Sequence, residues 1–186
     1  RGFGANGATL SSPNGTHVLV VTGAVAHVEG VRIHGGAGEG ILVHGGSLFA
    51  NDIVVEGATG DGIRLGVHSH GTITNSTFRS NNFGINATES SAGIFQGNIF
   101  EANTVAGLAV QLSGSAIVER NTIRDNSVVG MIVESNASVL LLNNTMSGHP
   151  VGLLVRRNGF VDTVNPANTF SSNGTDVQCF ERGIID

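Results

Sequence analysis

The chain has 186 residues, 12% of them charged, and a formal net charge of −5. This length predicts one domain. The basic residues are scattered, so we expect no nucleic acid partner, and no apolar run reaches the roughly 18 residues of a membrane span.

Residues 1–14 are rich in glycine and predict an N-terminal extension or a partial cap. Residues 15–178 carry a repeat that is marked by a glycine every 22 to 25 residues. A fixed period of this size indicates one supersecondary unit stacked on itself. The repeat glycines are Gly15, Gly40, Gly62, Gly84, Gly107, Gly130, Gly152 and Gly174. Residues 179–186, with Phe180 and two isoleucines, predict a C-terminal cap.

Each repeat predicts three short strands. The residues one and three positions after the glycine are mostly apolar, as at Leu108 and Val110 after Gly107. A period of two indicates a strand with one buried face. Two more apolar columns follow in each repeat, and strands this short pair with their equivalents in neighbouring coils, ~4.8 Å away. The sequence therefore predicts an all-β fold, a single-stranded parallel β-helix with about seven coils and three parallel sheets.

Asparagine recurs at two of the turns in each repeat. It tolerates left-handed backbone conformations, and stacked Asn side chains form hydrogen-bonded ladders. We expect two such structural ladders, one with Asn51, Asn98, Asn121, Asn144 and Asn168 and the other with Asn81, Asn103, Asn126 and Asn173.

The pattern of Gly107–Val110 followed by Asn121–Asn126 resembles the right-handed parallel β-helix repeat of the pectate-lyase-like superfamily. The asparagine-marked form is similar to the repeats of periplasmic copper-site assembly proteins and of many bacterial surface proteins. The resemblance covers residues 15–178 and implies a right-handed helix. It also implies a secreted or cell-surface protein, with the periplasm as a further location.

Enzymes of that superfamily act on polysaccharides through carboxylates on the outer surface of one sheet. Proton transfer at a sugar ring needs an acid and a base within reach, and the outward columns of this repeat hold no carboxylate cluster. We therefore assign no catalytic residue and no cofactor. The polar side chains that face outward suit hydrogen bonding to a sugar, and these are Arg64, Thr74, Asn86, Gln96, Glu119 and Arg120.

Histidines gather in the first half of the chain, and three of them are weak candidates for a transition-metal site. His68 and His70 point to the same side of an extended segment, and His44 lies one coil earlier. No histidine or carboxylate ladder recurs at the coil spacing, so we assign no metal.

Apolar residues also occupy outward positions toward the C-terminus, where the core does not require them. Such a stripe usually marks a partner surface. Its members are Ala109, Ile132 and Leu154 on one sheet and Ile117 and Leu140 on the next. We expect a second copy of the chain, or another domain of a longer parent protein, to cover it.

These observations favour a non-catalytic module that presents a rigid face to a polysaccharide or to a protein. Two alternatives stay open. One is a fragment of a polysaccharide lyase, hydrolase or epimerase, and the other is a structural spacer or assembly stalk.

Overall fold

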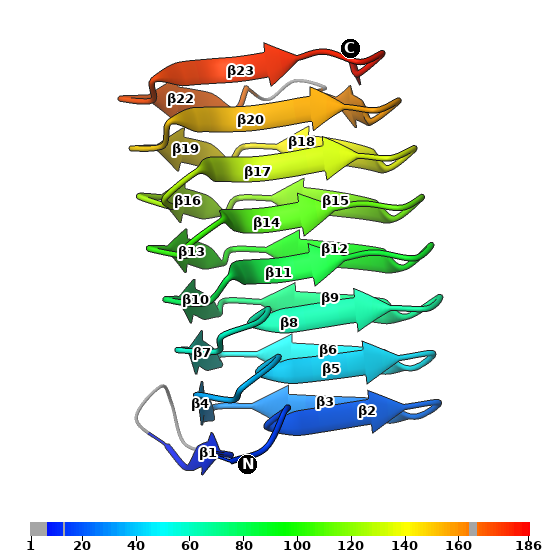
Figure 1. Cartoon of the computed structure of the whole chain (residues 1–186), viewed down its shortest axis with the longest axis vertical. Helices are drawn as coiled ribbons and strands as arrows, with labels where there is room; N and C mark the ends of the chain where they lie inside the picture. Colours follow the sequence, from blue (N-terminus) through cyan, green and yellow to red (C-terminus); the bar gives the residue numbers. More distant parts are fainter. Residues whose placement is uncertain (1–6, 13, 164–166) are drawn as a thin grey trace.

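The computed structural model describes residues 7–12, 14–163 and 167–186, which form 24 short strands. Figure 1 shows these strands stacked in layers along the long axis, with the N-terminus at one end and the C-terminus at the other. The strands form three parallel sheets of eight strands each. Nowhere in the described ranges is there a helix long and apolar enough to cross a membrane.

We name the sheets A, B and C. Sheet A contains β1 (Thr9–Ser11), β4 (Arg32–His34), β7 (Val54–Glu56), β10 (Thr77–Arg79), β13 (Ile99–Glu101), β16 (Thr122–Arg124), β19 (Thr145–Ser147) and β22 (Thr169–Ser171). Sheet B contains β2 (Leu19–Thr22), β5 (Ile41–His44), β8 (Ile63–Gly66), β11 (Phe83–Ala87), β14 (Ala106–Val110), β17 (Val129–Glu134), β20 (Val151–Arg156) and β23 (Thr175–Cys179). Sheet C contains β3 (Val25–Glu29), β6 (Ser47–Asn51), β9 (His70–Thr74), β12 (Ala92–Gln96), β15 (Ser115–Glu119), β18 (Ser138–Leu142), β21 (Phe160–Asp162) and β24 (Ile184–Ile185).

The predicted parallel β-helix with three sheets is therefore confirmed, with about eight turns rather than seven. Every strand pairs with the equivalent strand of the next turn, as Ile85 pairs with Leu108 between β11 and β14. Residues 179–186, expected as a cap, contain the end of β23 and all of β24, which pairs with β21. Residues 1–6 of the expected N-terminal extension lie outside the described ranges.

The register differs from the predicted one in the first and last turns. Leu19 pairs with Ile41, the residue that follows Gly40. The position equivalent to Gly40 in the first turn is therefore occupied by Val18 and not by Gly15. Leu153 pairs with Val177, so Asp176 rather than Gly174 occupies the position equivalent to Gly152.

The repeat glycines of the middle turns are required by close packing. A Cβ atom at Gly107 would lie 2.8 Å from Ile123 Cγ2 and 2.9 Å from Phe100 Cβ. No side chain fits at that position without moving core atoms, which explains why glycine recurs there.

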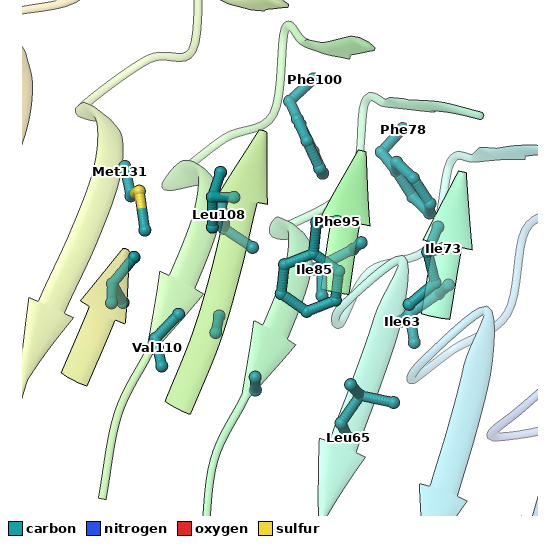
Figure 2. Close-up of a cluster of buried hydrophobic side chains, with 14 of the residues drawn as sticks. Ile63, Leu65, Ile73, Phe78, Ile85, Phe95, Phe100, Leu108, Val110 and Met131 are labelled. Carbon is teal, nitrogen blue, oxygen red and sulfur yellow. The ribbon is translucent and has the colours of Figure 1, made fainter. Parts of the chain in front are cut away.

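The interior is filled by large apolar side chains from all three sheets. Phe78, Phe95 and Phe100 are fully buried, and the rings of Phe78 and Phe100 stack with centroids 5.2 Å apart. Figure 2 shows these rings beside the isoleucines and leucines of neighbouring turns, including Ile85 and Leu108. Each turn is too small to bury its own apolar face, so the stack supplies the core.

Two ladders of buried polar side chains run along the stack. The first lies between sheets C and A and contains Ser76, Asn98, Asn121, Asn144 and Asn168. The second lies between sheets A and B and contains Asn81, Asn103, Asn126, His149 and Asn173. In each ladder, a rung's side chain accepts a hydrogen bond from the backbone N–H of the preceding rung.

Asn51 is the one predicted rung that the structure places elsewhere. It pairs with Thr74 at the end of β6 and faces outward, where its side chain bonds Glu29, Thr74 and Asn75. Ile53 takes the equivalent position in that turn, because its N–H donates to Ser76 Oγ at 3.2 Å.

The left-handed residue of each turn is the one before the rung, and not the Asn itself. Arg120 has φ +54° and precedes Asn121, and Ala102 has φ +53° and precedes Asn103. The bend of the chain thus comes from the preceding residue, and the rung then satisfies the buried backbone of the bend.

Candidate functional site

The outer face of sheet C carries three parallel rows of side chains, one member from each turn. Strand residues alternate between core and solvent, and the register stacks like positions on one another. The central row is His27, Phe49, Thr72, Ile94, Ile117, Leu140 and Asp162. The polar row on one side is Glu29, Asn51, Thr74, Gln96 and Glu119, and the small row on the other side includes Ser47, His70, Ala92, Ser115 and Ser138.

Two hollows lie along these rows and share Thr72. The larger, of about 380 Å³, lies between the small row and the central row, from His70 to Leu140. The smaller, of about 280 Å³, is lined by His27, Glu29, Phe49, Asn51, Thr72 and Thr74, together with Val28 and Ala50. We name the two together the sheet C groove. The groove runs along the axis of the β-helix, because its lining residues come from strands of successive turns.

Small side chains explain why the face is hollow. The outward side chains of Ala92 and Ser115 are small and leave space beside the larger side chain of Ile94. The larger members of the central row are exposed despite being apolar: Phe49 by 43%, Ile94 by 44% and Ile117 by 39%. A concave and mainly apolar surface with a few polar groups is typical of a ligand site.

The polar row is partly tied together by its own hydrogen bonds. Thr74 Oγ1 donates to Asn51 Oδ1 at 2.9 Å, and Gln96 Nε2 donates to Glu119 Oε2 at 3.4 Å. Arg120 Nη1 lies 2.9 Å from Glu119 Oε1. The row is therefore partly held in place, and its members Glu29, Asn51 and Thr74 line the smaller hollow.

The six predicted ligand residues do not form one site. Thr74, Gln96, Glu119 and Arg120 belong to the polar row of sheet C or its adjoining turn. Arg64 and Asn86 pair with each other on β8 and β11, in sheet B. The prediction combined the outward columns of two sheets, which face different sides of the solenoid.

Arg64 and Asn86 instead join a second group of polar side chains, which we name the sheet B cluster: His17, Glu39, Asp61, Arg64, Asn86 and Glu89. His17 Nδ1 lies 2.7 Å from Glu39 Oε2, and Arg64 forms ion pairs with Glu89 at 3.3 Å and with Glu39 at 3.9 Å. Asn86 Nδ2 donates to Asp61 Oδ2 at 3.1 Å.

Asp61 is the most perturbed group of this cluster. It is only 5% exposed, and this burial raises the pKa of its carboxyl to about 6. The negative charge of Glu39 raises the pKa further, while the hydrogen bond from Asn86 and the charge of Arg64 oppose the rise. Asn86 Oδ1 is buried and has no hydrogen-bond partner among the described residues.

Reasoning from sequence missed Glu39 and did not connect Asp61 with Arg64 and Asn86. Glu39 and Asp61 directly precede Gly40 and Gly62, in a column whose later members are apolar. In the structure, Phe83, Ala106 and Val129 follow them in that column. Two successive carboxylates before the repeat glycine were the available signal.

The predicted partner surface divides in the same way. Ala109, Ile132 and Leu154 are only 0%, 6% and 7% exposed, so they are not an accessible surface. They pack on the outer side of sheet B with Ala106 and Val129 and with the partly buried Phe83, Val105 and Val151. Neighbouring large side chains cover them, which the column pattern did not reveal. Ile117 and the partly exposed Leu140 lie in the sheet C groove.

The three candidate histidines do not converge on one point. His44 ends β5. His68 lies one coil later, in the turn between β8 and β9, with φ +56°, and His70 begins β9. Across the described part of the chain, no three His, Cys, Asp or Glu side chains come together as a metal site.

Comparison of the sequence with models of known protein families identifies the family of this chain. The model for the right-handed β-helix region matches residues 16–176, which is most of the chain. No curated protein and no solved structure matches the chain. The match spans nearly the same residues as the stacked turns of Figure 1. The chain therefore belongs to the right-handed β-helix family.

Proposed function

We propose that this chain is a non-catalytic β-helical module of a secreted or cell-surface protein, and that it binds an extended polysaccharide in the sheet C groove. Within the β-helix family we place it in the asparagine-marked branch of the pectate-lyase-like superfamily. The observation that carries the proposal is the groove itself, in which exposed apolar side chains of the central row lie beside hydrogen-bonding side chains over several turns. These are Ser115 and Ser138 in the larger hollow and Glu29, Asn51 and Thr74 in the smaller one.

Sugar rings combine apolar C–H faces with hydroxyl groups at their edges. Such rings match a surface where Phe49, Ile94 and Ile117 offer apolar contact while Asn51, Thr74 and Ser115 offer hydrogen bonds. Adjacent turns are ~4.8 Å apart, so a linear polymer that follows the helix axis meets the same kinds of contact repeatedly.

A peptide strand is a less suitable occupant. Peptides that add to sheets bind to an unpaired strand edge. In the middle of sheet C, β9, β12 and β15 each pair with a strand on both sides, so their backbone groups are already used. The face thus offers side chains alone, which favours the polysaccharide.

Size-exclusion chromatography of a polysaccharide panel incubated with the protein tests the proposal. We expect the protein to co-elute with at least one intact polymer, and the double variant Ile94→Ser/Ile117→Ser to lose this co-elution. Val128→Ser, which removes an exposed apolar side chain outside the groove, is the matched control and should still bind. If no polymer retains the protein and it elutes as an oligomer, the proposal fails in favour of the structural spacer.

The sheet B cluster supports a second candidate, a lyase, hydrolase or epimerase. Asp61, with its pKa of about 6 beside Glu39 and Arg64, has the property expected of a general acid near neutral pH. A polymer that shifts to smaller fragments would favour this candidate for a lyase or hydrolase, provided that Asp61→Asn abolishes the shift. Retention of the fragmentation in Asp61→Asn would assign it to other residues or to a contaminant.

A further inference from the structure

The geometry points to a polysaccharide that carries free amino groups, with one ammonium group bound by Glu29 in the smaller hollow of the sheet C groove. This inference rests on the proposed function and names the class of polymer. It depends on the charges at the N-terminal end of the groove, which the binding proposal itself did not use.

Glu29 supplies a carboxylate that is available to a cation. The residue is exposed at the end of β3 and lines the smaller hollow. Its side chain accepts one long hydrogen bond, from Asn51 Nδ2 at 3.4 Å. Within the described ranges Glu29 forms no ion pair, and Arg32, three residues later, binds Glu56 at 2.5 Å. An ammonium group in the hollow would supply the missing positive charge.

Phe49 supplies an apolar contact for the sugar ring beside this carboxylate. Its ring is 43% exposed in the central row, one turn beyond Glu29, and stacks on His27 with centroids 4.9 Å apart and an interplanar angle of 11°. His27 therefore covers the face of the ring on the side of β3. A carboxylate and an apolar ring that line one hollow of about 280 Å³ are suited to a sugar ring that carries an ammonium group.

The remaining charges of the groove disfavour an acidic polymer. Neither hollow has an arginine among its lining residues, and the sequence contains no lysine. Glu119 is paired with Arg120 in the polar row, so that arginine's charge is already matched. A uronate chain would bring its carboxylates to Glu29 in a hollow whose one other ionisable lining side chain is the imidazole of His27. With neither arginine nor lysine there to balance the carboxylates, their like charge reduces the affinity for an acidic polymer.

Isothermal titration with hexasaccharides tests the inference at a pH where amino sugars are charged. Three β-1,4-linked hexamers share one backbone: glucosamine, N-acetylglucosamine and glucose. A galacturonate hexamer serves as the acidic probe. We expect the glucosamine hexamer to bind about tenfold more tightly than its N-acetylated form, and to weaken with added salt. The galacturonate hexamer should bind most weakly.

Two variants assign the effect to the smaller hollow. Glu29→Gln should lower the affinity for the glucosamine hexamer to that of the neutral hexamers and leave the neutral hexamers unaffected. Glu101→Gln makes the same change of charge on the outer face of sheet A, where Glu101 pairs with Arg124, and should leave all affinities unchanged.

The outcomes distinguish failure of the ammonium site from failure of the proposed polysaccharide binding. Equal binding of the amino and N-acetylated hexamers, or tightest binding of galacturonate, overturns the ammonium site and leaves a polysaccharide-binding groove. Failure of all four hexamers to bind also overturns the ammonium site. The proposed function then stands if another polymer of the size-exclusion panel binds, and fails if none does.

Discussion

Asn144 Oδ1 accepts two hydrogen bonds from Asn121, one from its backbone N–H and one from its side-chain Nδ2, each at 3.0 Å. Asn121 Nδ2 also donates to Phe95 O at 2.8 Å, in the turn before. One buried amide therefore connects three successive turns. Among the described residues, the buried backbone N–H of Asn121 has its hydrogen-bond acceptor in Asn144 Oδ1, so the ladder is a condition for burying the bend between sheets C and A.

Replacing Asn121 by Ala should lower the free energy of unfolding by ~1–3 kcal/mol, because buried backbone groups lose their partners. Urea denaturation measures this difference. Asn82→Ala is the control, because Asn82 accepts an exposed hydrogen bond from Thr104 and lies outside the ladders. A melting curve for Asn121→Ala that matches the wild type would refute the structural role of the ladder.

His149 should be replaceable by Asn but not by Ala. Its Nδ1 accepts from the N–H of Asn126 at 3.1 Å, which requires the tautomer whose Nε2–H donates to Ile123 O, also at 3.1 Å. Asn makes the same two kinds of bond in the preceding turns of this ladder. We expect His149→Ala to cost ~1–3 kcal/mol in thermal or urea unfolding and His149→Asn to cost clearly less. Equal losses in both variants would mean that the imidazole acts through packing alone.

Phe100→Ala should lower the free energy of unfolding by ~3–5 kcal/mol, because it opens a cavity beside Phe78 in the centre of the stack. Differential scanning calorimetry gives the size of the loss. Phe180→Ala removes a ring that is 38% exposed near the C-terminal end, and should cost much less. A small effect at Phe100 would contradict the inward register of sheet A.

Asp61 should make the stability of the protein fall as the pH rises from about 4 to about 7. Its carboxyl has a pKa of about 6 in the folded chain against an ordinary value of 3.8, so the folded state holds the proton more tightly. This contribution to stability is complete below the lower value and is lost as the pH passes the higher one. Asp61→Asn should therefore be more stable than the wild type at about pH 8, by up to ~3 kcal/mol, and similar to it at about pH 4.

Urea titrations of both proteins across this range give the measurement. Glu181→Gln is a suitable control, because its carboxylate is exposed and pairs with Arg157 at the surface. A constant difference between wild type and Asp61→Asn at all pH values would contradict the raised pKa.

The repeat could be predicted from the sequence because each turn repeats its steric requirements. Gly107 lies against core atoms and Asn121 satisfies a buried bend, so the same residue types recur at the coil spacing. The position of the repeat glycine is occupied by Val18 in the first turn and by Asp176 in the last, and there the predicted register was wrong at Gly15 and Gly174. Asn51 was misplaced for the same reason, since Ile53 takes the rung in its turn.

The candidate site could be predicted less completely from the sequence than the fold. Periodicity shows which residues face outward, but it does not show which sheet they share or how far their neighbours cover them. Arg64 and Thr74 were therefore joined across two faces, and the covered Ile132 was grouped with the exposed Ile117. The hollows depend on differences in side-chain size between rows, and the pKa of Asp61 depends on burial, so both required the structure.

The most direct test of the account is an NMR titration of methyl-labelled protein with the glucosamine hexamer. We expect the methyl signals of Ile94, Ile117 and Leu140 to shift with the added sugar, because these side chains line the sheet C groove. The methyl signals of Ile132 and Leu154, on the outer side of sheet B, should not move. Shifts confined to sheet B, or sugar binding that leaves Ile94 and Ile117 unchanged, would contradict a polysaccharide site on sheet C.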